Sequence, residues 1–348
     1  MRKRKRKSKL LTERQKNNNA LTQEPKKRKK RMSRKKKRMY LIIGFFVALL
    51  LFSGITFAKN KLAEIRENNL RAQTGQIIKK NAEKKSVDEY GNEKKSNVKF
   101  QVHIINVGQG QSILIKQGDN EVLIDGGNKD HGQTVSDYIS SYVDGPLEYV
   151  INTSYEDAYS GGLATIYSNY KVKHTIYSMK PEKGSADTQF YDFYKIAKKK
   201  SGDIEEGNSQ NIDMGKGITL VPYKGKDAKT LICVLTYGNG QKAVITGAAD
   251  SKEMQYLNNL EDGSCNFLVL PQLGSPFASP KSVLKSLGPG NLIISSADAD
   301  HGGPSKDTVK SFAEFSSTIY TTYNSGNIVL KFTNGSMQTD AKTVQVNG

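Results

Sequence analysis

Short apolar runs separated by glycine turns dominate the chain from residue 98 to its end at Gly348. The first three runs are VKFQVHIINV, SILIKQ and EVLID, and the turn sequences GQGQ and GDN join them. This pattern predicts three consecutive strands. Similar apolar runs predict further strands over residues 147–151, 217–223, 230–238, 242–247, 266–271 and 291–296.

Helical patterns are interspersed with these strands. They cover residues 134–143, 188–200, 251–260 and 305–315, and Pro304 and Ser305 open the last of them. The sequence TIYTTYNSGNIVLKFTNG predicts a closing hairpin about Asn324–Gly326. Strands with interspersed helices indicate an α/β or α+β arrangement, and residues 98–348 are numerous enough to form one domain with a substantial core.

A different pattern precedes this domain. MYLIIGFFVALLLFSGITFA, residues 39–58, contains no charged residue and has the length that crosses the hydrocarbon core of a bilayer. Residues 1–38 hold 20 lysines and arginines and two glutamates, which places the N-terminus in the cytoplasm and the later chain outside. The sequence therefore predicts a single-pass membrane protein with an extracytoplasmic domain. A cleaved signal peptide that ends at TFA is the alternative.

Charge is distributed unevenly along the chain. The formal net charge is +19, yet residues 101–348 hold 22 basic and 26 acidic residues. The basic charge thus belongs to a disordered tail suited to anionic lipid headgroups, and a broad phosphate-binding face on the domain is not expected. Residues 59–97 read as a polar helical stalk or linker, with a short dimerising coiled coil as the alternative.

Five loop segments of the domain, and a sixth segment near its end, resemble one known family. INVGQGQSILIKQGDNEVLIDGG, residues 105–127, looks like the opening of the metallo-β-lactamase-fold domain of ComEC-type competence proteins. NTSYEDAYSGG, VITGAADSKEMQYL, VLPQLGSPFAS and LIISSADADHGGPS resemble that family's later site segments, and IYTTYNSGNIVLKF resembles its closing hairpin. The resemblance implies a four-layer αββα sandwich with a site at one edge of its two sheets.

The same resemblance locates the family's metal ligands on this chain. Catalytic zinc takes three or more protein ligands from His, Cys and carboxylates and keeps one position for water. Most of the aligned positions hold residues that coordinate poorly, and Gln111 also departs from the opening motif. The former-site positions are Ser154, Glu156, Ala158, Tyr159, Ala248, Gln272, Leu273 and Gly303. The sequence therefore predicts a degenerate site with no catalytic residue and no cofactor.

Several residues near these positions remain candidates for binding. Glu156, Asp157 and Asp250 could gather into a Mg²⁺ or Ca²⁺ site, with solvated loop carboxylates as the plainer interpretation. Tyr155 and Tyr159 could stack a sugar or base, or fill space.

Histidines and cysteines outside the aligned ligand positions add further candidates. His131 follows the first glycine pair near the expected cleft and could contact a ligand. SADADHGG, with Asp298, Asp300 and His301, repeats part of the family's metal motif at a different loop, and we expect it to cap the next helix. His103 is expected to be a packed strand residue, and Asp125 to organise its glycine turn. A disulfide between Cys233 and Cys265 stays open.

Three functions are consistent with these patterns. The first is a membrane-anchored pseudoenzyme that binds an extracellular ligand or protein partner at the cell surface. The second, implied by the resemblance alone, is a ComEC-like hydrolase or nuclease that would act on nucleic acid and hold Zn or Mn. The third is a structural subunit of the cell envelope. The lost ligands count against the second, so the protein is expected not to be an enzyme.

Overall fold

The computed structural model describes residues 61, 100–181, 188–238, 240–259, 265–316, 318–333 and 336–344. The chain divides into two units, residues 1–77 and 78–348, and both sheets lie in the second. The predicted tail, membrane span and stalk lie outside the described residues, apart from Lys61. Within the described ranges no helix combines the length and the apolar character that a membrane span requires.

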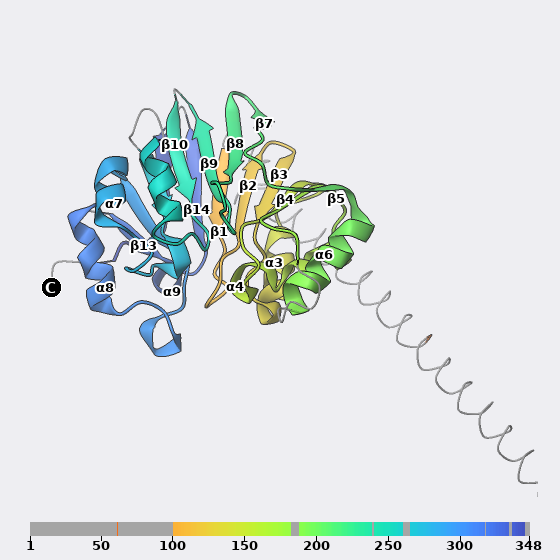
Figure 1. The fold of residues 1–348 in the computed structure, drawn as a ribbon, viewed down its shortest axis with the longest axis horizontal. Coiled ribbons are helices and arrows are strands. Elements are labelled where there is room, and N and C mark those ends of the chain that lie inside the picture. Colours follow the sequence, from red (N-terminus) through yellow and green to blue (C-terminus); the bar gives the residue numbers. More distant parts are fainter. Residues whose placement is uncertain are drawn as a thin grey trace, which may run out of the picture. The chain divides into compact units, whose positions relative to one another are not determined.

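One sheet of the domain has eight strands (Figure 1). Their order is β15 (Ser336–Gln338), β14 (Ile328–Thr333), β1 (Phe100–Ile104), β2 (Ile113–Gln117), β3 (Asn120–Ile124), β4 (Leu147–Asn152), β5 (Val172–Tyr177) and β6 (Ser201–Glu206). Neighbours from β15 to β3 are antiparallel, and those from β3 to β6 are parallel.

The second sheet has seven strands. Their order is β13 (Ile319–Thr321), β12 (Asn291–Ile294), β11 (Cys265–Val269), β10 (Gln241–Ile245), β9 (Ile232–Tyr237), β8 (Ile218–Tyr223) and β7 (Ile212–Gly215). Strands β10 to β13 run parallel, and β7 to β10 pair antiparallel. Both sheets therefore combine a meander with parallel crossovers.

Helices cover the outer face of each sheet, on opposite sides of the domain in Figure 1. The eight-stranded sheet carries α3 (Gly132–Ile139), α5 (Leu163–Asn169) and α6 (Thr188–Lys200). The seven-stranded sheet carries η2 (Glu253–Asn259), α7 (Lys281–Leu287), α8 (Lys306–Ser311) and η5 (Phe312–Glu314). Shorter pieces lie in the loops: η1 (Lys129–His131), α4 (Asp157–Ser160), η3 (Pro271–Leu273), η4 (Ala299–His301) and α9 (Thr322–Ser325).

The core consists of three apolar layers that follow from alternation along the strands. In β1, Phe100, Val102 and Ile104 point between the sheets and join side chains of the other sheet such as Leu220 and Phe267. The opposite faces of the strands pack against the helices in two further clusters. This arrangement is a four-layer αββα sandwich, and it fits the metallo-β-lactamase fold that the sequence led us to expect.

The predicted closing hairpin is wrong. β13 pairs with β12 in the seven-stranded sheet, whereas β14 pairs with β1 in the eight-stranded sheet. The turn residues Asn324 and Ser325 lie in or beside α9, which links the two sheets, and the hairpin partner of β14 is β15. A local turn signal cannot distinguish a hairpin from a crossing between sheets, because strand pairing depends on which apolar faces are buried in the core.

Most other predicted elements are present with small shifts in their ends. The segment predicted as a helix over 188–200 is α6, while 251–260 forms a 3₁₀ helix rather than an α-helix over its described part. Several short elements were not predicted: α4, α5, β5, β6, β7, α7, α9 and β15. Apart from β5, α5 and α7, they are largely exposed or no longer than about one helical turn, so their apolar periodicity is weak.

The two cysteines are free and buried. Cys233 on β9 packs between the sheets, whereas Cys265 on β11 packs against the helix layer. The side chains thus lie on opposite faces of their sheet and do not form the disulfide that the sequence left open.

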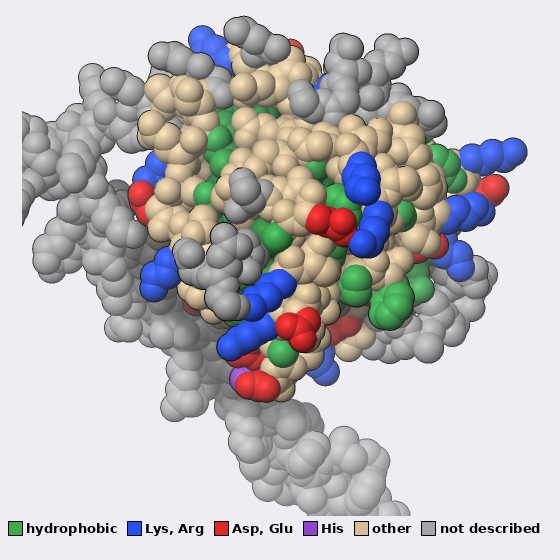
Figure 2. Space-filling view, turned by 90° about the vertical axis from the view of Figure 1, so that its left-hand side faces the viewer, with side chains coloured by type: hydrophobic (Ala, Val, Ile, Leu, Met, Phe, Trp, Pro, Cys, Tyr) green, Lys and Arg blue, Asp and Glu red, His purple; other side chains and the backbone are tan. Residues whose placement is uncertain are grey.

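The domain surface in Figure 2, on the side of α7 and α8, shows lysines and acidic residues interspersed rather than gathered by sign. Lys281 and Glu314 form one such pair, with 2.6 Å between Nζ and Oε1. This face therefore offers no single-sign field for a polyanion, as the near balance of charge over residues 101–348 led us to expect.

Candidate functional site

The loops that carry the resemblance meet at one edge of the sandwich. They follow the carboxyl ends of β1, β3, β4, β10, β11 and β12. The backbone N–H of Gln111 donates to Ala158 O at 2.9 Å, and that of Gln272 donates to Gly247 O at 2.9 Å. Ser295 Oγ donates to Gly110 O at 3.0 Å, which ties the loop after β12 to the loop after β1. Segments far apart in sequence thus form one continuous edge.

The side chain of Asp125 joins three loops of this edge. Its side chain is fully buried and accepts hydrogen bonds from the N–H and hydroxyl of Thr153, at 2.7 and 2.6 Å, and from the Gln111 amide at 2.8 Å. Burial raises the pKa of this carboxyl to about 7, although the three donors act in the opposite direction. The role expected for Asp125, organising its turn, agrees with these contacts, and its φ of 59° is a conformation that Asp tolerates.

The first loop of the former site is closed. Ser154 is buried, and its Oγ accepts the Glu156 N–H at 3.2 Å. Tyr159 is 1% exposed, and its hydroxyl lies 3.4 Å from Gly247 O on the loop after β10. Burial, Glu156 and Asp125 all hold the pKa of Tyr159 well above its usual range, so the phenol stays neutral. The burial of Tyr159 agrees with the space-filling role that the sequence also allowed for it.

The loops from the seven-stranded sheet supply no better ligands. Ala248 is buried, and its carbonyl lies 3.4 Å from Gln272 Nε2. Gln272 and Leu273 occupy the left-handed region, with φ of 46° and 57°. Non-glycine residues rarely adopt this conformation, and it costs about 1–2 kcal/mol for each residue. The surroundings of this loop therefore hold it in shape.

The acidic residues of the candidate cation site do not converge. Asp250 Oδ1 accepts the N–H groups of Lys252 and Glu253, at 2.9 and 2.7 Å, while Glu253 Oε2 accepts the Asp250 N–H at 3.0 Å. This reciprocal pair is a capping box at the start of η2. The predicted ligand role of Asp250 is thus replaced by a structural one, which the D-x-x-E spacing could have revealed.

Glu253 itself was missed by sequence reasoning. Its buried carboxylate also accepts the N–H groups of Lys229 and Thr230, at 3.0 and 3.3 Å, and the Thr230 hydroxyl at 2.9 Å. It thereby fastens the segment before β9 to η2.

Glu156 and Asp157 stand at the rim without other ligands beside them. Glu156 is exposed, and Asp157 begins α4. Asp157 Oδ1 is buried without a hydrogen-bond partner among the described residues, a feature that can mark a cation. A Cβ at Gly161 would lie 2.2 Å from this oxygen and 2.4 Å from the Lys129 backbone nitrogen. Backbone atoms rather than further carboxylates therefore lie near Asp157 Oδ1.

The histidine candidates are held by local partners. His131 Nδ1 lies 2.7 Å from Asn128 Oδ1, and its ring packs beside Gly108 on the loop after β1. It is half-buried at the edge, which keeps a contact with a ligand open. His301 pairs with Asp298 at 2.6 Å, and each holds the pKa of the other towards the charged form: Asp298 lowered, His301 raised.

The SADADHGG loop is a cap, but of a different helix from the one expected. Asp298 accepts the His301 N–H and caps η4, whereas Ser305 caps α8 by accepting from Thr308 N. The last former-site position, Gly303, lies in this loop, and a side chain there would meet Ala297 O at 1.8 Å. The loop therefore could not hold a histidine at Gly303 in its present form.

The donor set does not fit a metal ion. In the ranges that the structure describes, no three His, Cys, Asp or Glu side chains gather closely enough to hold one. Neutral hydroxyl, amide and alkyl groups occupy the remaining positions, and those groups make poor zinc ligands.

Comparisons with known proteins show a similarity of fold and nothing further. No family model matches the chain, and no curated protein matches it. Among solved structures, the metallo-β-lactamase fold protein YhfI of Bacillus subtilis is 15% identical, with 67% of this chain and 100% of that chain covered and a TM-score of 0.46.

Two metallo-β-lactamases are also similar. MEM-A1, a subclass B3 enzyme from a soil metagenome library, is 13% identical, with 50% of this chain and 81% of that chain covered and a TM-score of 0.36. A Cronobacter sakazakii enzyme is 14% identical, with 49% and 77% covered and a TM-score of 0.38. At these identities and scores, what those proteins do is not transferred to this chain.

Proposed function

We propose that this protein is a membrane-anchored, extracytoplasmic domain of metallo-β-lactamase fold that binds a ligand or partner at the cell surface and does not hydrolyse it. The observation that carries the proposal is the filling of the former site. Tyr159 and Ala248, from the two sheets, are buried at positions that metal ligands would need. A catalytic metal needs at least three protein ligands and an open position for water.

The exposed rim is the surface that we assign to binding. Tyr155 is 36% exposed on the loop after β4, and Phe277 is 91% exposed on the loop after β11. Glu156 and Gln272 are exposed on the same two loops. Aromatic groups on exposed loops of a rigid scaffold are typical of recognition surfaces. Because the centre is filled, we assign contact with a partner to this rim rather than to a deep cleft.

Metal analysis of the full chain tests the loss of hydrolysis. We expect less than about one-tenth of an equivalent of zinc or manganese after purification without added metal, since a stable site needs three protein ligands. We also expect no phosphodiesterase activity on DNA or small diesters, and an unfolding temperature that chelator does not change. One metal per chain, lost in Glu156→Ala but kept in the matched surface variant Glu314→Ala, would establish the hydrolase alternative instead.

Cysteine labelling tests the topology. The chain has only Cys233 and Cys265, and both are buried, so a membrane-impermeant maleimide should leave the parent protein unlabelled in intact cells. We expect Phe277→Cys to be labelled in intact cells and Ser8→Cys only after lysis. Labelling of Ser8→Cys alone in intact cells would reverse the orientation, and recovery of labelled Phe277→Cys protein from the medium would indicate a cleaved signal peptide.

Crosslinking from the rim tests the binding role. A photoreactive residue at Phe277 should give a discrete adduct in intact cells, whereas one at Tyr191, 42% exposed on α6, should not. Equal adducts from both positions would favour the structural-subunit alternative, in which the whole surface is packed into an assembly. No adduct from Phe277 would remove the rim from the proposal.

A further inference from the structure

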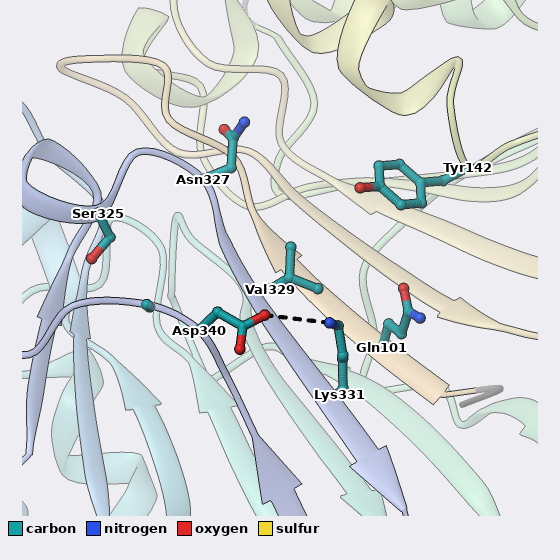
Figure 3. A pocket seen from close by; sticks show the side chains of 8 residues that line it. Gln101, Tyr142, Ser325, Asn327, Val329, Lys331 and Asp340 are labelled. Carbon is teal, nitrogen blue, oxygen red and sulfur yellow. Dashed lines mark ion pairs between the residues drawn. The ribbon is translucent and has the colours of Figure 1, made fainter. Parts of the chain in front are cut away.

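A groove of ≈ 270 Å³ lies on the outer face of the eight-stranded sheet (Figure 3). Its floor is formed by outward-pointing residues of β1 and β14, because their neighbours along each strand point into the core. Gln101 and Lys331 are directly opposite in the strand register. Tyr142, after α3, forms one wall, and Asp340, after β15, forms the other.

A buried histidine orients the Gln101 amide on this floor. His103 Nε2 lies 2.9 Å from Gln101 Oε1, and His103 Nδ1 lies 2.9 Å from the Tyr138 hydroxyl. An amide oxygen only accepts, so Nε2 carries the proton and Nδ1 accepts from Tyr138. Burial first, then Lys116 and Lys331, lower the pKa of His103 to about 4, so the ring is neutral at neutral pH and its two hydrogen bonds select the tautomer. Gln101 Nε2 is thereby directed away from the histidine.

A second amide is fixed at the upper end of the groove. Asn327 Oδ1 accepts the Asn106 backbone N–H at 2.8 Å, so the side-chain nitrogen of Asn327 points away from the Asn106 backbone. Ser325 Oγ donates to Lys342 O and accepts the Lys342 N–H, both at 3.1 Å. These bonds fasten the segment that carries Asp340 beside the floor. The polar groups are therefore held in place before any ligand arrives.

The charges in the groove nearly cancel. Lys331 Nζ lies 3.5 Å from Asp340 Oδ2, as the dashed line in Figure 3 shows. The groove combines two amides, one carboxylate, one ammonium and a tyrosine ring, so donors and acceptors occur together without net charge. An anion would meet the carboxylate, and a purely apolar ligand would cover these polar groups without offering them a hydrogen bond.

The groove also differs from a peptide-docking edge. β14 and β1 are each paired on both sides, so their backbone groups are already used in the sheet. Addition of an extended peptide as a further strand needs an unpaired edge. The floor instead offers side chains on a sheet face.

We infer that this groove binds one sugar unit of a neutral glycan. A sugar ring presents hydroxyls that both donate and accept, which matches amides and a carboxylate held at fixed positions. Its apolar C–H face matches the Tyr142 ring, which His103 supports edge-on at 4.3 Å between ring centroids. The volume lies just below the usual range for small-molecule pockets, about 300–1,000 Å³, and therefore suits one ring rather than a longer segment.

Glycan titration of the full chain tests the inference. The protein is purified in a detergent without a sugar headgroup and titrated calorimetrically with the trisaccharides of glucose and of N-acetylglucosamine. We expect at least one to bind, and Gln101→Ala and Asn327→Ala each to weaken it roughly threefold to tenfold, as loss of a neutral hydrogen bond implies. Gln255→Ala, an exposed amide on η2, is the matched control and should bind like the parent protein.

One further variant and one spectroscopic measurement complete the test. Asp340→Asn changes a side chain that is 96% exposed and in no core contact, so weaker binding in this variant cannot arise from unfolding. In nuclear magnetic resonance spectra, the side-chain amide signals of Gln101 and Asn327 should shift on addition of the sugar. The inference is overturned if neither trisaccharide binds, if binding survives all three groove variants, or if inorganic phosphate or glycylglycine displaces the sugar. The metal analysis above does not bear on this groove, so the two proposals fail separately.

Discussion

At the residue scale, buried polar groups decide what the loop edge can do. Asp125 ties the loop after β3 to Thr153 after β4, and Tyr159 reaches across to Gly247 on the other sheet. Neither contact leaves a group that could activate water, because the carboxylate is surrounded by donors and the phenol is neutral. The same kind of burial leaves His103 neutral beneath the groove on the outer face.

The stability of the protein should depend on His103 in acid. Its folded pKa of about 4 lies below the unfolded value of 6.5, so the unfolded chain binds more protons between these values. The free energy of unfolding should therefore fall as the pH drops from 6.5 to 4, by up to about 3 kcal/mol from this residue. Chemical denaturation at several pH values should show this loss in the parent protein and not in His103→Gln. Equal pH slopes in the two proteins would contradict the assignment.

Gly162 should tolerate no side chain. A Cβ at this position would lie 2.1 Å from Gly126 O and 2.8 Å from Gly132 Cα, both backbone atoms of neighbouring loops. We expect Gly162→Ala to lower the free energy of unfolding by about 1–3 kcal/mol, the usual cost of overpacking. Gly145→Ala, where a Cβ meets nothing within 4 Å, should change it by less than about 0.5 kcal/mol. A similar small effect at both positions would show that the loops can separate without cost.

At the element scale, short helices set the course of the chain between sheets. α9 carries the chain from β13 in one sheet to β14 in the other, where the sequence had predicted a turn. η2 begins at the capping box of Asp250 and Glu253 and covers β10 and β11. These elements close the sandwich at its edge.

Removal of the Asp250 cap should destabilise the domain moderately. Asp250→Ala leaves the N–H groups of Lys252 and Glu253 without their acceptor, and we expect a loss of about 1 kcal/mol in unfolding free energy. Asp300→Ala, another exposed loop carboxylate, is the control and should be near neutral. If Asp250→Ala instead abolishes binding of a divalent cation without changing stability, the carboxylate is a ligand and not a cap.

At the scale of the whole molecule, one core links both sheets. The apolar cluster between them contains residues of β1, β2, β3, β4, β5 and β14 in the first sheet and of every strand in the second sheet. A domain with a shared core is expected to unfold as one unit. The proposed membrane anchor and basic tail, by contrast, lie outside the described residues.

The domain should therefore fold without the first 97 residues. We expect residues 98–348 to unfold in a single cooperative transition, at the same denaturant midpoint as the domain in the full chain. Calorimetry and circular dichroism of the fragment check this, with coincident transitions as the criterion. Two separable transitions would mean that the sheets do not depend on each other.

Much of this protein could be read from its sequence. Alternating apolar residues in β1, β2 and β3 and the periodicity of α6 are local patterns, so strand and helix positions followed from them. The resemblance in five segments led to the sandwich with its edge loops. The proposal that Ser154, Tyr159 and Ala248 stand where ligands would be needed also comes from the sequence, because metal coordination depends on residue type.

Only the tertiary structure decided the rest, because it depends on contacts between distant residues. The sheet to which β14 belongs is set by the apolar faces that it covers, and the turn before it carries no such information. Whether Asp250 caps a helix or binds a cation depends on Glu253 N–H lying within hydrogen-bond distance. The groove beside Gln101 arises from β1, β14 and the segment after β15, whose residues lie more than two hundred positions apart in the chain and meet only when the sheet forms.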